Sequence, residues 1–332
     1  ETLNAGADGN NTAVGYFAGQ SVTTGIQNTL VGSLAGDALT DSDYNTVVGY
    51  QALSTDTLGG RSTAIGYQTL ANQNFTTATS AYNTAVGYSA GVAITTGIQN
   101  TLIGAIAGDA LTDADYNVAV GVTALGGDTK GNNSTAIGYS ALVAQNFTTS
   151  TDSFNTAVGY EAGGAVTTGI QNTLIGSRAG DALTDADYNT AVGMGALGSD
   201  TLGSYSTAIG RNALYSQNFT TATNSLNTAV GYAAGEGITT GTSNTLVGSG
   251  AGDALTVGNS NVVVGTLALT ADTKGDRNVA IGVNALEVQN FTTSTDSYNT
   301  AVGHAAGASV TTGINNTLIG GLAGDGLTDA DN

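Results

Sequence analysis

Acidic residues at alternate positions form the group in this sequence that is best suited to binding a ligand. A run of the form Asp-x-Asp-x-Asn occurs three times, each time shortly after another Asp. Oxygen ligands of this kind are what hard cations such as Ca²⁺ prefer. The runs predict calcium sites with Asp37, Asp41, Asp43 and Asn45; Asp109, Asp113, Asp115 and Asn117; and Asp181, Asp185, Asp187 and Asn189 as ligands.

These runs are not EF-hand loops. Val118 rather than Gly follows Asn117, and no Glu closes a loop of the EF-hand length. The alternative hypothesis is an acidic, solvated turn whose Asn belongs to a structural ladder.

A second repeated group is the segment Asn-Phe-Thr, which occurs once in each long repeat. A regularly spaced aromatic side chain suits stacking on a sugar or contact with a partner protein. The alternative is that the ring packs back and fills the bulge made by the extra residues, because exposed apolar surface is costly. The four side chains concerned are Phe75, Phe147, Phe219 and Phe291.

The composition excludes several other functions. The chain has no Cys, one His and no Pro, and its six Lys and Arg against 25 Asp and Glu give a formal net charge of −19. A nucleic-acid partner is not expected, because that partner needs a basic surface. No apolar run approaches the roughly 18 residues of a membrane span, so membrane insertion is not expected. His304 is the lone His and the Glu residues follow no period, so we expect no enzyme.

The elements that position these residues follow from a strict internal repeat. The motif Asn/Ser-Thr-small-Val/Ile-Gly recurs along the chain, and its final Gly falls first at positions 15, 32, 49, 66 and 87. Three equal intervals and one longer interval therefore make a super-repeat of four units, and this order continues to the end of the chain. A short fixed period of this kind is typical of a solenoid.

The repeat predicts the domain organisation. We expect a partial coil at residues 1–10 and one continuous solenoid of about 18 coils over residues 11–332. Its super-repeats are 11–82, 83–154, 155–226 and 227–298, with a partial one at 299–332.

Each coil is expected to be all-β, because β-branched residues and Gly alternate too closely for a helix. The pattern predicts two short strands per coil, each paired in parallel with the same strand of the next coil. The fourth position is always Val or Ile and the eighth is Ala in every coil but one, so both are expected to face inward. The first position is Asn in most coils, which predicts a stacked ladder of side-chain amides.

Thr occupies the second position of nearly every coil, and a further Thr-rich stretch ends it. Regular Thr columns on a flat face suit the ordering of water, as on an ice-binding surface. The alternative is that Thr is present because it is a good strand residue.

The runs NTAVGYFAG, NTAVGYSAG and STAIGYSAL resemble the repeats of bacteriophage tail-fibre proteins and the head repeats of trimeric autotransporter adhesins. This resemblance covers residues 11–332. It implies a parallel β-roll or β-solenoid, often a homotrimer, in an extracellular attachment fibre at the surface of a cell or virion. Such a fibre would bind a cell-surface glycan or protein receptor. A self-assembling extracellular filament that grows end to end and an ice-binding solenoid are the alternative functions.

Overall fold

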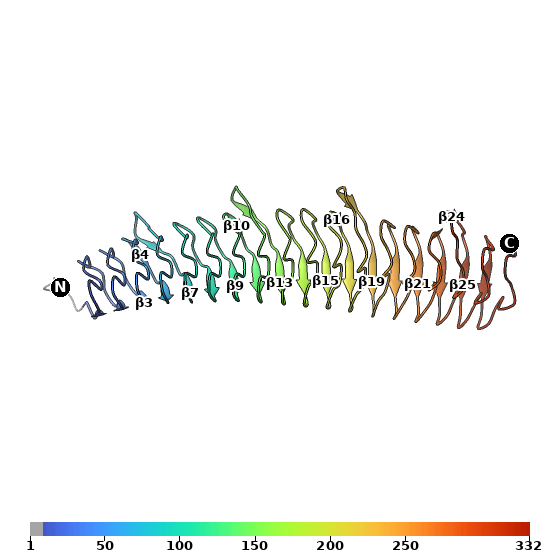
Figure 1. Cartoon of the computed structure of the whole chain (residues 1–332), viewed down its shortest axis with the longest axis horizontal. Coiled ribbons are helices and arrows are strands. Elements are labelled where there is room, and N and C mark those ends of the chain that lie inside the picture. Colours follow the sequence, from blue (N-terminus) through green and yellow to red (C-terminus); the bar gives the residue numbers. More distant parts are fainter. Residues whose placement is uncertain (1–8) are drawn as a thin grey trace. The chain divides into compact units, whose positions relative to one another are not determined.

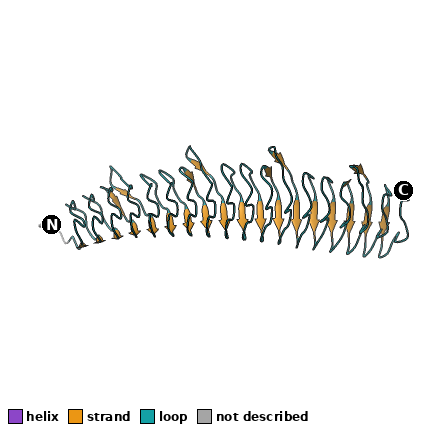
Figure 2. Ribbon diagram, in the orientation of Figure 1, coloured by secondary structure: helices purple, strands orange, loops and turns teal. Residues whose placement is uncertain are grey.

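In the computed structural model, each coil contributes one three-residue strand to a parallel stack. The structure describes residues 9–332, which divide into two compact units, one ending at Thr168 and the other beginning at Gly169. Each unit is a parallel β-solenoid. Within the described residues there is no helix, and therefore none that could cross a membrane (Figure 2).

The first unit contains nine main strands and four two-residue strands (Figure 1). The main strands are β1 (Thr12–Val14), β2 (Thr29–Val31), β3 (Thr46–Val48), β5 (Thr63–Ile65), β7 (Thr84–Val86), β8 (Thr101–Ile103), β9 (Val118–Val120), β11 (Thr135–Ile137) and β13 (Thr156–Val158). The short strands are β4 (Gly59–Gly60), β6 (Thr79–Ser80), β10 (Gly131–Asn132) and β12 (Thr151–Asp152).

The second unit repeats this arrangement with nine main strands and four short ones. The main strands are β14 (Thr173–Ile175), β15 (Thr190–Val192), β17 (Thr207–Ile209), β19 (Thr228–Val230), β20 (Thr245–Val247), β21 (Val262–Val264), β23 (Val279–Ile281), β25 (Thr300–Val302) and β26 (Thr317–Ile319). The short strands are β16 (Gly203–Ser204), β18 (Thr223–Asn224), β22 (Gly275–Asp276) and β24 (Thr295–Asp296).

Within each unit, every main strand pairs in parallel with the main strand of the next coil. The register keeps equivalent residues level, so that Thr12 lies opposite Thr29 and Val14 opposite Val31. The predicted parallel β-solenoid of about 18 coils is therefore confirmed, with nine coils in each unit. The predicted continuity over residues 11–332 stays a prediction, and residues 1–8 of the predicted partial coil lie outside the described residues.

The prediction of two strands in every coil is wrong. A second strand forms only beside the long coil of each super-repeat, where the added residues pair with the preceding coil. There β6 pairs in parallel with β4, and Gly59 lies opposite Thr79. Elsewhere the rest of the coil is joined to the next one by isolated backbone hydrogen bonds, such as the one from the Thr23 N to the Thr40 carbonyl at 3.0 Å.

The direction of the strand side chains also differs from expectation. Val14, Ile65 and Ile103, at the fourth position, are 57%, 36% and 39% exposed, so this column faces outward rather than inward. The third position is the buried one, as at Leu30 and Val47. Successive strand residues point to opposite faces, and the Ala at the eighth position fixes which face is the core.

The core is narrow and filled by small and large residues in alternation. Leu30 is buried between two coils and lies against Gly19 and Gly36, where an added methyl group would come within 2.5 and 2.9 Å of its methyl carbons. Ala18 and Ala35 are also buried. A Gly at the ninth position therefore makes room for the Leu at the third position, which is the close packing that interiors require.

A ladder of Asn side chains joins the coils at the start of each main strand. The Asn28 Oδ1 accepts a hydrogen bond from the Asn45 backbone N at 2.9 Å, and the Asn45 Oδ1 accepts one from the Ser62 backbone N at 2.8 Å. The Asn45 Nδ2 donates to the Gly59 carbonyl at 3.2 Å. The predicted amide ladder is confirmed, and these members of it are almost completely buried.

The Gly that follows each main strand allows the coils to approach closely. Gly121 has φ +138, and a methyl group there would lie 2.3 Å from the carbonyl oxygen of Gly138 in the next coil. Both the backbone angle and the contact exclude a side chain.

We expect Gly121→Ala to lower the free energy of unfolding by about 2–4 kcal/mol, because it combines backbone strain with overpacking. Gly164→Ala is the matched control, since the nearest atom to its added methyl group is 3.3 Å away and its φ is not in the left-handed region. Urea denaturation of both variants measures the difference. Equal loss in the two variants would mean that the close approach of Gly121 to Gly138 has no special weight in stability.

We expect Asn117→Ala to cost about 2–4 kcal/mol, because it leaves the Ser134 backbone N and the Gly131 carbonyl unpaired in a buried site. Asn117→Ser should cost less, since Ser62, Ser134 and Ser206 occupy the same column naturally. Thermal unfolding of the two variants compares them. If the ladder does not contribute to stability, both variants will unfold at the wild-type temperature.

Candidate functional site

The acidic residues of each run lie in the turn that precedes a ladder Asn, and they accept hydrogen bonds from different groups. Asp41 is exposed and accepts a hydrogen bond from the Thr24 hydroxyl. The Asp43 Oδ1 accepts one from the Ile26 backbone N at 2.8 Å. Asp115 and Asp187 repeat this contact with Ile98 and Ile170 at 2.7 and 2.8 Å. Each run thus ties its own coil to the preceding one.

The predicted Asn ligands use their side chains in the amide ladder. Asn45, Asn117 and Asn189 are at most 1% exposed, and their amides are used in the ladder. Among residues 9–332, no three acidic or His side chains form a group that could hold a metal ion. Two carboxylates per turn remain, as at Asp113 and Asp115, whereas Ca²⁺ takes six to eight oxygen ligands.

The first Asp of each predicted set lies one corner earlier, away from the run. Asp37, Asp109 and Asp181 are half-buried. Burial raises the pKa of the Asp37 and Asp109 carboxyl groups, and hydrogen bonds from their own backbone N oppose that shift. The Asp37 Oδ1 is buried and has no hydrogen-bond partner.

The other two carboxyl groups with a raised pKa belong to the acidic runs themselves. Burial raises the pKa of Asp115 and Asp187, and the neighbouring charges of Asp113 and Asp185 raise it further. The backbone hydrogen bonds from Ile98 and Ile170 act on the pKa in the opposite direction.

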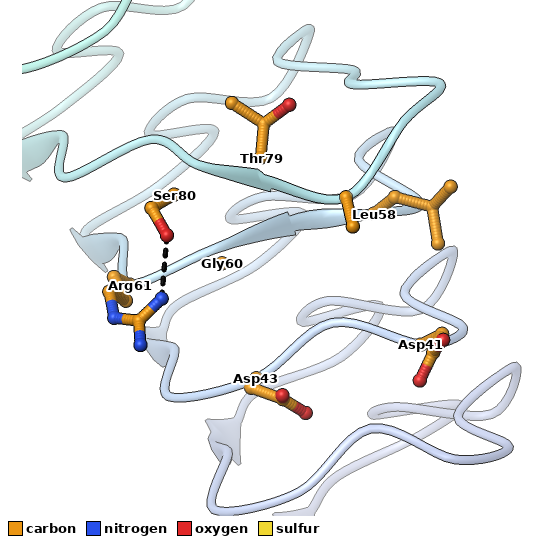
Figure 3. Close-up of a pocket in the computed structure, with 8 residues that line it drawn as sticks. Asp41, Asp43, Leu58, Gly60, Arg61, Thr79 and Ser80 are labelled. Atoms are coloured by element: carbon orange, nitrogen blue, oxygen red, sulfur yellow. Dashed lines mark hydrogen bonds between the residues drawn. The ribbon is translucent and has the colours of Figure 1, made fainter.

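A cavity of about 130 Å³ opens beside the first acidic run, below the bulged coil. Figure 3 shows Asp41 and Asp43 on one wall and the strand pair β4 and β6 on another, with the Arg61 guanidinium donating to the Ser80 hydroxyl at 2.6 Å. Leu58 and Thr79 complete the rim. The cavity is lined by both acidic and basic side chains. Arg61 already has partners, so the cavity does not present a free cation.

The bulged coil encloses a buried polar network that the sequence analysis missed. Asp56 is fully buried, and its Oδ1 accepts from the Gly59 and Phe75 backbone N at 2.9 and 3.1 Å. Its Oδ2 accepts from the Gln73 Nε2 at 2.6 Å, and the Gln73 Oε1 accepts from the Asn83 Nδ2 at 2.8 Å. The network therefore connects the bulge to the Asn ladder.

This network recurs once in each full super-repeat. Burial raises the pKa of Asp272 in the fourth copy, and the hydrogen bond from Gln289 opposes the shift. The signal in the sequence was present, since an Asp and a Gln recur at the same interval in every full super-repeat. The pairs are Asp56 and Gln73, Asp128 and Gln145, Asp200 and Gln217, and Asp272 and Gln289.

The four predicted surface phenylalanines are inside the bulge. Phe75, Phe147, Phe219 and Phe291 are each 6% exposed. The Phe75 ring lies over Gly59, where an added methyl group would be 2.7 Å from its Cδ2. The alternative in which the ring packs back and fills the bulge is therefore confirmed, and the surface contact is corrected.

The exposed aromatic residues belong to a different surface, which we call the outer face. It consists of four columns, each with one residue per coil. Two columns are the outward residues of the main strands, Thr at the second position and Val or Ile at the fourth. The other two flank them: the corner residue before the ladder Asn, as Tyr44, and the residue after the Gly that ends the main strand, as Tyr50.

The corner column depends on an uncommon backbone conformation. The corner residue has positive φ in every coil from Asn10 to Asn315, for example 64° at Tyr44 and 63° at Arg61. A non-glycine residue in this region carries steric strain of about 1–3 kcal/mol. The Tyr44 backbone N donates to the Ile26 carbonyl at 3.1 Å, so a hydrogen bond between coils offsets the strain.

Side chains of the flanking columns stack on one another from coil to coil. Tyr50, Tyr67 and Tyr88 have ring centroids 5.4 and 5.3 Å apart. In the corner column the Arg61 guanidinium lies between the rings of Tyr44 and Tyr82, at 5.0 and 5.7 Å from their centroids. Because the ring faces stack on one another, the ring edges and hydroxyl groups point outward.

The outer face contains no acidic residue. The four columns hold more than a fifth of the chain, yet none of the 25 Asp and Glu lies in them. Three Arg do, at positions 61, 211 and 277. The chain therefore concentrates its negative charge outside this one surface.

Neither a protein-family model nor a curated protein sequence matches this chain.

We expect calcium to have little effect on folding, because the ladder uses the Asn oxygens and leaves two carboxylates in each acidic turn. The melting temperature in EGTA should equal that in about 1 mM Ca²⁺, the weak end of protein sites, at matched ionic strength. Asp113→Asn with Asp115→Asn is the variant to compare. A calcium-dependent rise in the wild-type chain that is smaller in this variant would contradict this expectation and support the predicted metal sites.

Proposed function

We propose that this protein is a structural segment of an extracellular fibre, of the tail-fibre or adhesin type, at the surface of a virion or cell. The observation that carries the proposal is the ladder of Asn28, Asn45 and their equivalents, which repeats the same contact between successive coils. Stability in such a stack is a sum of neighbouring interfaces, so length can be added without a new core. The proposed role is mechanical and adhesive.

The fibre would display two kinds of surface to its surroundings. Bulged loops project once per super-repeat, with Thr76 and Thr77 exposed at the first of them, and the outer face runs along the main strands. A cell-surface glycan or protein is the proposed receptor. Further copies of the chain are the other proposed partner, as a homotrimer or end to end. The net charge of −19 would keep fibres apart from anionic surfaces.

The proposal predicts that length follows coil number. Deleting residues 83–154 removes one whole super-repeat and keeps the order of short and long coils, so the shortened chain should fold and lose about 19 Å of length, four coils at ~4.8 Å each. Deleting residues 83–146 is the control, because it joins coils out of register. Small-angle X-ray scattering and circular dichroism compare the two. A compact particle, or equal folding of both deletions, would contradict a fibre segment.

A further inference from the structure

The outer face has the chemistry of a covered surface. In α/β proteins both faces of a parallel sheet are buried, because the connecting helices lie against them. Here the inner face is covered by the coil, and nothing within residues 9–332 covers the outer face. Ile137, Ile209 and Ile281 remain 38%, 39% and 37% exposed even though residues of neighbouring coils lie above and below them.

The apolar column of this face is unbroken. The fourth position is Val or Ile in every coil, although Thr would satisfy the same strand geometry. A purely solvated face would have no need for that restriction. The absence of carboxylates points the same way, since a buried unpaired charge is costly and depletion of charge is typical of interface centres.

The area is that of a stable association. Nine main strands in one unit at ~4.8 Å spacing, and a width of about six residues at ~3.3 Å each, give roughly 850 Å². A standard interface buries about 800 Å² on each partner. One unit therefore offers a surface of sufficient size.

The charge and the repeat favour a second copy of the chain as the occupant. Two copies with a net charge of −19 repel each other wherever their acidic surfaces meet, and the outer face is the surface without carboxylates. A partner that follows the face over nine coils must share its strand spacing and its repeat. The chain itself has both.

We propose that the outer face is a self-association surface that seats a second copy of this chain against its Thr and Val/Ile columns. The stacked tyrosines border the contact and contribute ring edges and hydroxyls. This inference rests on the proposed fibre function and deepens it by naming the face through which copies associate.

The test introduces carboxylates into the face. Ile137→Glu with Ile281→Glu places two charges where two copies would bury them, and like charges at an interface disfavour association strongly. Ala144→Glu with Val288→Glu is the matched control: it adds the same charge to the same two coils, outside the face, and Val288 is 43% exposed. Sedimentation equilibrium gives the mass and the dissociation constant of all three proteins.

We expect a wild-type oligomer, a dissociation constant at least about 100-fold higher for the face variant, and a change below about threefold for the control. Circular dichroism should show both variants folded. A wild-type monomer, or equal dissociation of the two variants, would overturn the inference.

A cysteine probe gives an independent readout, because the natural chain contains no Cys. Thr135→Cys lies in the Thr column of β11, and Thr148→Cys lies in an exposed bulge. Association should slow the labelling of Thr135→Cys by a maleimide, and dilution should restore it, whereas Thr148→Cys should be labelled equally fast at both concentrations. The reverse pattern would overturn the inference.

The outcomes separate this inference from the fibre proposal. A monomer that is extended in solution overturns self-association and leaves the fibre segment standing. If that monomer also shows thermal hysteresis, the outer face binds ice, and the Thr and Val/Ile columns serve ordered water. A compact particle overturns the fibre proposal itself.

Discussion

The hydrogen bond from each ladder Asn to the next coil is the interaction on which the rest of the structure depends. The Asn45 side chain receives the backbone of Ser62 and holds the carbonyl of Gly59, so one amide fixes both the end of its own coil and the start of the next one. The site is buried, and an amide there has no water to replace a lost partner. The regular interval between ladder positions in the sequence is the direct consequence of this constraint.

The bulged coil shows how the ladder tolerates added chain. The extra residues would break the spacing if they lay in the strand, but they leave the coil at its far side and pair with the preceding coil through β4 and β6. Asp56 and Gln73 then connect the bulge back to Asn83. The buried carboxylate is supported by backbone donors, which is the condition for keeping charge in an interior. Phe75 closes the remaining space.

The distribution of charge separates two surfaces with different roles. Acidic turns border the bulges, where Asp43 and its equivalents cap the backbone of the preceding coil. The outer face has no carboxylate and presents Thr, Val, Ile and Tyr in columns. Because every coil repeats the same four positions, a small favourable contact between one coil and a partner is repeated along the stack. This repetition is what makes a repeated face suitable for an extended partner.

The sequence by itself determined the period, the parallel stacking and the amide ladder, since each follows from residues that recur at fixed spacing. It did not determine which strand residues face inward. Leu30 and Val31 are both apolar, and a three-residue strand is too short for alternation to decide between them. The tertiary structure decides it through Gly19 and Gly36, whose lack of a side chain leaves room for Leu30 in the core. It also decides that Asn117 serves the ladder and Phe75 the interior, because both are settled by contacts between coils.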